Sequence, residues 1–469
     1  ETPVYRTEAL LPGDRLAGPT ILVENTSTIV VEPGWAAEMT RKGHLILTRA
    51  EPRPEVHAIG TQADPVMLEI FNNLFMSIAE QMGTTLANTS YSVNIKERLD
   101  FSCAVFDRKG DLIANAPHIP VHLGSMGESI RAVMRDNAGK IKPGNVYALN
   151  APYNGGTHLP DVTVITPVFD DKGQDILFYV GSRGHHADIG GITPGSMPPD
   201  SKTVEEEGVL IDNFLLVDQG NLREDALRDL LCGGTYPVRN FDQNLADLAA
   251  QIAANEKGAQ ELRKMVDHFG LETVWAYMDH VQDNAEESVR RVLDVLTNGQ
   301  FTCEMDNGAV IDVKITVNHK KREATLDFFG SSAQLDSNFN APTAVCHAAV
   351  LYTFRTLIDD DIPLNAGCLK PLKLVIPKKS MLSPVYPAAV VAGNVETSMI
   401  ITDALFGALG ALASSQGSCN NFTFGNDRHQ YYETICGGSG AGPDFDGTDA
   451  VHTHMTNTRL TDPEVLEWR

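Results

Sequence analysis

Two neighbouring stretches of the chain are largely apolar runs with a turn-forming cluster between them, and this pattern predicts a β-hairpin. Residues 162–169 and 176–180 are rich in β-branched and aromatic side chains, and the turn-forming cluster Asp-Asp-Lys-Gly at 170–173 separates them. Apolar residues occupy every second position at 313–317 and at 324–328. These two stretches lie on either side of "NHKKRE", which predicts a second hairpin. Antiparallel sheet is therefore expected in at least two parts of the chain.

Other stretches carry apolar residues at every third or fourth position, which is the spacing of a helix with one buried face. Residues 67–82 follow this spacing, and Gly83 is expected to end that helix. A helical segment is expected over about 223–298, where Asn240 caps one helix and Gly270 separates it from the next.

The start of the chain has a different character. Residues 1–50 hold short β-forming runs broken by Pro-Gly pairs, and the linker-like "EPRPEVHAIGTQADP" follows at 51–65. We expect residues 1–55 to form a small β unit that packs against the rest, and residues 56–469 to form a large second region. The predicted fold class is α+β or mixed: a small N-terminal β unit, then a mixed α/β region with antiparallel hairpins and a helical segment.

Composition narrows the function classes. The chain has 469 residues, 42% of them hydrophobic and 21% charged, which suits two or three globular domains. A formal net charge of −24 would repel a phosphate backbone, so nucleic acid is a poor partner. Seven cysteines without a Cys-x-x-Cys pair favour a reducing cytoplasm, and no apolar run is long enough to span a membrane.

The first hairpin also predicts a cluster of polar side chains. Folding about its turn brings residue 161 opposite roughly residue 183, with an uncertainty of a residue or two, so His158, Asp161 and His185 share one end. Imidazole nitrogen and carboxylate oxygen are donors that divalent manganese, iron or zinc accept. The alternative is a surface hydrogen bond, which is the usual meaning of an isolated His-x-x-Asp.

Three other motifs carry weaker signals. His118 and His122 are four residues apart, as two metal ligands on one helix would be. Pro117 and Pro120 make a helix implausible there, so the two histidines are expected either to line a pocket or to be polar residues of a loop. "CGGSGAG" at 436–442 lacks the Gly-Lys-Ser/Thr of a phosphate-binding loop. Cys436 has no nearby base, so nucleophilic cysteine chemistry is not favoured.

Taken together, several motifs resemble the hydantoinase B/oxoprolinase family over roughly residues 60–469. They are "ERLDFSCAVFD", "HIPVHLGSM", "NAPYNGGTHLPDVTVITPVF", "SRGHHADIGGITPGSMPPDS", "EGVLIDNF" and "HTHMTNTRLTDPEVLE". In addition, "LLPGDRLAGPTILVENTSTIVVEPGW" at 10–35 resembles the C-terminal end of the hydantoinase A family, the ATP-using partner. Both halves occur in one chain in ATP-dependent 5-oxoprolinases.

The resemblance implies an interior piece of such an enzyme, truncated at its C-terminus, with ATP and magnesium bound outside this chain by the hydantoinase A-like half. The implied reaction is ATP-driven opening of the lactam of 5-oxoproline to glutamate, part of glutathione metabolism. In acetone carboxylase-like relatives a manganese site maps by motif onto His158, Asp161 and His185. Manganese is therefore favoured, with zinc or iron as alternatives, and a homo-oligomer is expected.

Further roles are expected around that site. His186 and Asp188 are expected to orient a ligand or shuttle a proton as catalytic residues, and Arg183 and His122 to bind the substrate. The alternatives are an ATP-dependent hydantoinase, an acetone or acetophenone carboxylase-like subunit, or a non-catalytic scaffold in which a fourth protein ligand such as His122 or His186 closes the metal shell.

Overall fold

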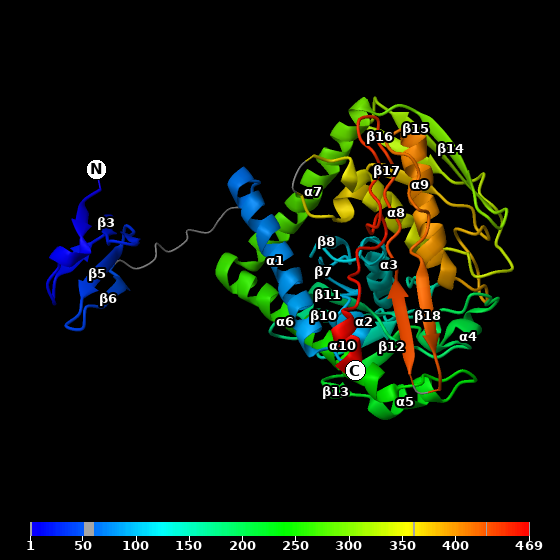
Figure 1. The fold of residues 1–469 in the computed structure, drawn as a ribbon, viewed down its shortest axis with the longest axis horizontal. Helices are drawn as coiled ribbons and strands as arrows, with labels where there is room; N and C mark the ends of the chain where they lie inside the picture. The colour runs from blue at the N-terminus through cyan, green and yellow to red at the C-terminus, as the bar shows by residue number, and fades with distance from the viewer. Residues whose placement is uncertain (1, 51–60, 360–361, 428, 469) are drawn as a thin grey trace. The chain divides into compact units, whose positions relative to one another are not determined.

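The computed structural model describes residues 2–50, 61–359, 362–427 and 429–468, and the chain divides into two compact units, residues 1–60 and 61–469 (Figure 1). Most of the linker predicted at 51–65 lies outside the described residues.

The first unit is built from short strands in two three-stranded sheets. One sheet has the order β1-β3-β4 (Val4–Arg6, Thr20–Val23, Thr28–Val31), and the other has the order β2-β5-β6 (Arg15–Ala17, Trp35–Met39, Leu45–Arg49). A 3-10 turn, η1, spans Thr7–Ala9. The buried core is small and centres on Leu22, Val31 and Ala37. The expected β character of this segment is therefore present.

The second unit is organised around a seven-stranded antiparallel sheet in the order β13-β12-β9-β10-β11-β7-β8. In chain order these strands are β7 (Phe101–Phe106), β8 (Leu112–Asn115), β9 (Val146–Leu149), β10 (Asp161–Phe169), β11 (Ile176–His185), β12 (Phe214–Asp218) and β13 (Asn221–Leu222). The central strands β7, β10 and β11 are buried almost throughout, because helices cover both faces of the sheet (Figure 1).

Alternate residues of β11 (Ile176–His185) therefore meet different helices. One face of the sheet carries α1 (Pro65–Thr89) and α6 (Phe241–Phe269), with α7 (Leu271–Val295) beside them; the other carries α3 (Pro120–Asp136) and, outside it, α8 (Thr343–Thr356) (Figure 1). Gly181 approaches Met126 of α3, whereas the Ser182 hydroxyl donates to the Gln251 carbonyl of α6. Odd-numbered residues at this end of β11 thus face α3, and even-numbered residues face α6.

A second, four-stranded sheet has the order β14-β15-β16-β17 (Gly299–Glu304, Val310–Asn318, Glu323–Asp327, Leu372–Val375), and β17 pairs parallel to β16. Helix α9 (Ser398–Leu409) packs on β14 and β15 and against α8. The remaining elements are α2 (Val93–Lys96), η2 (Pro194–Ser196), α4 (Val204–Glu207), α5 (Glu224–Cys232), η3 (Ala366–Leu369), the π-helix η4 (Gly393–Thr397), the hairpin β18–β19 (Asn421–Gly425, Gln430–Thr434) and α10 (Pro463–Trp468).

Both predicted hairpins are confirmed, since β10 pairs antiparallel to β11 and β15 pairs antiparallel to β16. The Asn240 cap is also confirmed, because its side chain accepts a hydrogen bond from the backbone N–H of Gln243, and Gly270 separates α6 from α7. The mixed α/β class with antiparallel sheets is as expected. Among the described residues no helix has the length and apolar character that a membrane span requires.

Two predictions about helix ends are wrong. Gly83 does not end α1, which continues to Thr89; the glycine is needed because a Cβ there would lie 2.6 Å from the His118 ring. A helix does form after Pro117, because Pro120 occupies the first turn of α3, where a missing N–H costs no intrahelical bond. His122 is therefore in a helix, while His118 precedes it.

Candidate metal centre

The strand order of the large sheet brings polar residues to one edge. Strand β11 is antiparallel to both β10 and β7, so its last residue meets the first residues of those two neighbours. Asp161 pairs with His185, two positions beyond the expected partner, and Gly184 pairs with Phe101, which places Asp100 beside them. The His185 backbone N–H donates to the Asp100 carbonyl at 3.0 Å, which ties this corner together.

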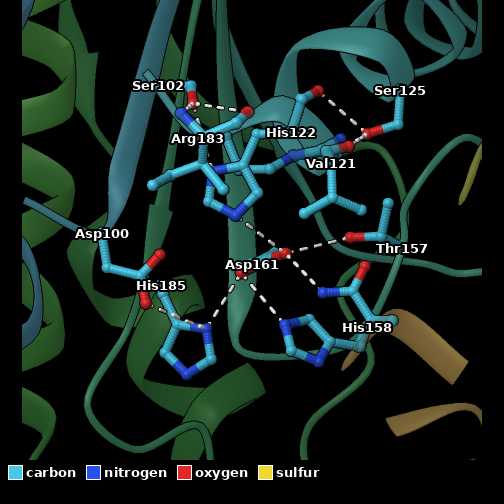
Figure 2. Close-up of polar contacts among 12 residues, drawn as sticks. Asp100, Ser102, Val121, His122, Ser125, Thr157, His158, Asp161, Arg183 and His185 are labelled. Carbon is cyan, nitrogen blue, oxygen red and sulfur yellow. Dashed lines mark hydrogen bonds and ion pairs between the residues drawn. The ribbon is translucent and has the colours of Figure 1, made fainter. Parts of the chain in front are cut away.

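The remaining side chains come from a loop and a helix. His158 lies three residues before β10, in a turn closed by the Asp161 N–H donating to the His158 carbonyl at 3.2 Å. His122 lies in the first turn of α3, on the face of the sheet toward which Asp161 and His185 point (Figure 2). His118 is held elsewhere, because its Nδ1 accepts the Cys103 N–H.

Asp161 is at the centre of the group and is fully buried. Its Oδ1 lies 3.1 Å from His185 Nδ1 and 3.1 Å from His158 Nε2 (Figure 2). Burial acts to raise the pKa of the Asp161 carboxyl, but the imidazoles of His122 and His158 outweigh it and hold the pKa well below its usual value. Asp161 is therefore present as a carboxylate, the form that binds a cation.

The other oxygen of Asp161 is held by three donors. Oδ2 lies 3.1 Å from His122 Nε2, accepts the Thr157 hydroxyl at 3.1 Å, and lies 3.4 Å from Asn394 Nδ2. Ser102 in turn contacts His122 Nδ1 at 3.3 Å. These contacts orient the carboxylate so that Oδ1 faces His158 and His185 (Figure 2).

The donor set fits a divalent cation. His158, Asp161 and His185 each offer a ligand atom within 4.8 Å of the other two, and in the described part of the chain this is the one such group. There, His158 Nδ1 and His185 Nε2 have no hydrogen-bond partner, and His158 Nε2 has only its ion-pair contact with Asp161, although both side chains are buried. Buried nitrogens are rarely left unpaired, and a cation would pair with them. Burial lowers the pKa of His185, against the opposing effect of Asp100, which favours the neutral, ligating imidazole.

A small cavity of about 20 Å³ lies against this group. Its polar wall is formed by Asp100, His122, His158, Asp161, His185 and Asn394, and Val121, Val395 and Met455 contribute apolar surface. A volume of this size holds about one water molecule.

One side of the cavity is closed by β19, which is anchored by a stack of three side chains. The Tyr432 ring stacks on His185 with centroids 4.6 Å apart and planes 15° apart, and the Arg98 guanidinium lies 4.6 Å from the Tyr432 ring centroid. Arg98 is fully buried and also donates to the Tyr432 carbonyl and to Thr434 Oγ1, both at 3.0 Å. The stack restricts the orientation of the His185 ring.

Arg183, expected to bind a substrate carboxylate, does not line the cavity. It faces α3 two positions before His185 on β11, and its guanidinium donates to the hydroxyls of Thr163, Ser125 and Ser129. Burial lowers its pKa to about 10, so it remains charged. Its donors are thus already used inside the protein, and the substrate-binding role expected for it stays a prediction.

His186 and Asp188, expected to be catalytic, also point away from the cavity. Because side chains alternate along a strand, His186 faces α6, where it contacts Gln251 and Asn244, each at 3.1 Å. Asp188 accepts the Arg239 guanidinium at 2.8 Å and backbone N–H groups, among them that of Gly190. The hydrogen bonds of both residues hold the loop after β11 in place. Their closeness to His185 in the sequence did not reveal these positions.

Asp100, Asn394 and Tyr432 line the cavity but were not among the predicted site residues. Asp100 directly precedes the alternating run of β7, so knowledge that β7 pairs with β11 would have placed it opposite His185. Asn394 and Tyr432 lie more than 200 residues further along, and a single sequence carries no local signal for such contacts.

Comparison with known proteins places these residues in context. The family model described as hydantoinase B/oxoprolinase matches residues 64–469. The chain is 47% identical to a 5-oxoprolinase of Dictyostelium discoideum and to 5-oxoprolinase 1 of Arabidopsis thaliana, in each case over 100% of this chain. It spans only 37% and 39% of the length of those two relatives.

Among solved structures, the fold is similar to that of the ATP-dependent caprolactamase from Pseudomonas jessenii. The TM-score is 0.75 at 24% sequence identity, and the match covers 87% of this chain and 73% of that one. At this identity the likeness concerns the fold alone.

Proposed function

The chain belongs to the hydantoinase B/oxoprolinase family, and from this membership we propose that it is the ring-opening part of an ATP-dependent 5-oxoprolinase. In that reaction the carbon–nitrogen bond of the lactam breaks, water supplies the new carboxylate oxygen, and the ring nitrogen takes up a proton to give glutamate. ATP is consumed because an amide is a poor electrophile until its oxygen is phosphorylated.

The observation that carries the proposal is the buried group of His158, Asp161 and His185 beside a water-sized cavity. A structural metal site closes its shell with four protein ligands, whereas a catalytic site keeps a position open. Of the two fourth-ligand candidates named from the sequence, His186 faces α6 and His122 contacts Oδ2 of Asp161; the Asp100 carboxylate, 3.9 Å from His185 Nδ1, also lines the cavity. The proposal of a catalytic site rests on the cavity beside the group, which has room for about one water molecule.

His158, Asp161 and His185 would hold the ion, and manganese is our first candidate, with zinc or iron as alternatives. When bound, a divalent cation polarises a carbonyl oxygen and lowers the pKa of water. The protein contributes orientation: Thr157 and His122 fix the carboxylate, and Tyr432 fixes the His185 ring.

The ATP and magnesium site belongs, in this proposal, to a hydantoinase A-like half in the parent protein, and residues 1–55 derive from the end of that half. Residues 56–469 are then the hydantoinase B-like domain. A cytoplasmic location and a homo-oligomer remain part of the same proposal.

The test uses the full-length parent protein with 5-oxo-L-proline and ATP. We expect glutamate formation that depends on both ATP and a divalent cation, and that is lost when a chelator removes the cation and restored when the cation returns. ATP-dependent glutamate formation by thoroughly metal-free protein would contradict the proposal.

A further inference from the structure

A larger pocket, with a volume of about 830 Å³, borders the candidate metal centre, and Tyr432 lines both spaces. Its wall is formed by α2 and the residues beside it, the start of α6, the β18–β19 hairpin and α10 (Figure 1). A volume of this size is typical of a small-molecule site. The residues of the metal group, His158, Asp161 and His185, do not line it, so the pocket is a separate space with its own chemistry.

Carboxamide and tyrosine side chains dominate the wall of this pocket. The lining residues of these two kinds are Asn94, Asn240, Gln243, Gln430, Tyr91, Tyr431 and Tyr432. Among the described lining residues Glu97 is the one acid and His429 the one base, and neither lysine nor arginine is present. A carboxamide carries a donor and an acceptor side by side, so this wall suits a ligand that is recognised by an amide group rather than by its charge.

Two of the carboxamides contact each other and leave one donor and one acceptor unused. Gln430 Nε2 donates to Gln243 Oε1 at 2.9 Å, and in the described part of the chain this is the one side-chain hydrogen bond of either residue. The backbone of Gln243 is fixed by the Asn240 cap at the start of α6. Because the two side chains are in contact, the free Gln243 Nε2 donor and the free Gln430 Oε1 acceptor are neighbours.

Asn94 adds a buried donor to the same wall. It is 4% exposed, and its Nδ2 has no hydrogen-bond partner among the described residues. The short helix α2 that carries it is fixed to α6, because the Asp247 carboxylate accepts the backbone N–H groups of Tyr91 and Ser92 at 2.7 and 3.1 Å. Buried donors are rarely left unpaired, and an acceptor on a ligand would complete this one.

We propose that this pocket binds the cyclic amide substrate by the edge of its amide group. A lactam ring holds its C=O and N–H on the same edge, so the carbonyl accepts from Gln243 Nε2 while the N–H donates to Gln430 Oε1. Asn94 Nδ2 donates to the carboxylate on the ring. The ligand is then held beside Tyr432, next to the metal group. The inference rests on the proposed function and names the residues that recognise its substrate.

Crystals of the full-length protein, soaked without ATP in either of two small molecules, test the recognition of the amide edge. The first molecule, 2-pyrrolidinone, has the ring amide but no carboxylate; the second, L-proline, has the ring and the carboxylate but no amide. We expect 2-pyrrolidinone in the pocket against Gln243 and Gln430, and no L-proline there. Any other pattern overturns the proposal, including a pocket filled by another segment of the parent protein.

Kinetics with 5-oxo-L-proline provides the second arm. Gln243→Leu removes the donor, and kcat/KM should fall about 10-fold, mostly through KM, while metal content stays at the wild-type level. Gln243→Glu keeps the oxygen that accepts from Gln430 but replaces the donor with an acceptor, so kcat/KM should fall at least as far. A rate close to wild type in Gln243→Glu would mean that Gln243 only supports Gln430, and this result, or loss of the metal, overturns the assignment.

Gln260 offers a matched control on the same helix. Its side chain is exposed, donates to Glu256 at 3.1 Å and does not line the pocket. Gln260→Leu should leave KM unchanged, and a loss equal to that of Gln243→Leu would overturn the proposal, because the effect would then come from α6 as a whole. If wild-type protein makes no glutamate at all, the proposed function fails; if it does and the pocket takes up no lactam, only this inference fails.

Discussion

At the scale of single residues, the orientation of Asp161 is the main determinant of the site. Its Oδ2 is held by three donors, and its Oδ1 faces the imidazoles of His158 and His185. The far nitrogen of each ring, His158 Nδ1 and His185 Nε2, has no hydrogen-bond partner among the described residues. The acceptor sites of one oxygen are thereby used by the protein, and the other oxygen is left for a cation. The arrangement explains why a low pKa and complete burial coexist in this carboxyl group.

The ligand assignment predicts the outcome of three substitutions. His158→Ala and Asp161→Ala should each abolish stoichiometric metal, because each removes one of three ligands. His186→Ala alters the residue next to the ligand His185 in sequence. Its side chain faces α6 and not the candidate metal group, so metal should be retained. Elemental analysis of the purified variants checks this, and retained metal in both of the first two would refute the site.

Glu207 predicts a pH-dependent stability. Its side chain is buried and accepts the backbone N–H groups of Val390 and Val391, which lead into the turn that carries Asn394. Burial raises its pKa from 4.5 to about 7, with the hydrogen bonds opposing. The stability from this group is complete below pH 4.5, declines as the pH rises, and is lost above about pH 7.

Glu207→Gln should remove that component. Denaturant unfolding at about pH 5 and about pH 8 measures it: the wild type should lose more stability between the two than the variant does. The same pH dependence in both proteins would show that Glu207 does not titrate in this range.

At the scale of elements, the position of α3 (Pro120–Asp136) matters most, because this helix carries His122 and packs closely on α8. A Cβ on Gly124 would lie 2.3 Å from the Cα of Ala348, a backbone atom that cannot move alone. Gly127 lies one turn later, and its nearest neighbours are Arg131 side-chain atoms at 3.5 Å or more.

These two glycines form a matched pair. Gly124→Ala should destabilise the protein by about 1–3 kcal/mol, because α3 and α8 must separate. Gly127→Ala should be neutral or stabilise by about 0.5–1 kcal/mol, through the better helix propensity of alanine. Thermal unfolding of both variants checks the order, and equal effects would mean that the close helix contact is unimportant.

Elements set by local sequence could be predicted, whereas an element end that depends on a tertiary contact could not. Hairpins, caps and apolar stripes are local, so β10–β11, β15–β16 and the Asn240 cap followed from nearby residue types, turn residues and spacing. The end of α1 did not, because Gly83 is required by a tertiary contact with His118 rather than by a helix stop.

For the site, the hairpin pattern in the sequence was sufficient to bring His158, Asp161 and His185 together. The sequence did not reveal where the neighbours of His185 point, because adjacency in sequence is not adjacency in space: His186 faces the other side of the sheet, and Arg183 donates to three hydroxyls. Asp100 and Asn394 needed the order of the strands and the packing of η4, which no local pattern encodes.

At the scale of the whole molecule, the large sheet, its helices and the second sheet form one unit that carries every residue of the candidate centre. The sequence analysis found no phosphate-binding motif, and the proposed function puts the nucleotide site in the remainder of the parent protein. We therefore expect this chain alone to lack ATPase activity. Phosphate release from ATP by the purified chain, above a heat-denatured control, would show that the chain itself has a nucleotide site.

The most direct measurement of the central claim is anomalous X-ray diffraction from crystals of the full-length protein loaded with manganese. The account predicts one strong anomalous peak between the side chains of His158, Asp161 and His185, and its loss from crystals of Asp161→Ala grown in the same way. A wild-type map without a peak between these three side chains, or an unchanged peak in the variant, would contradict it.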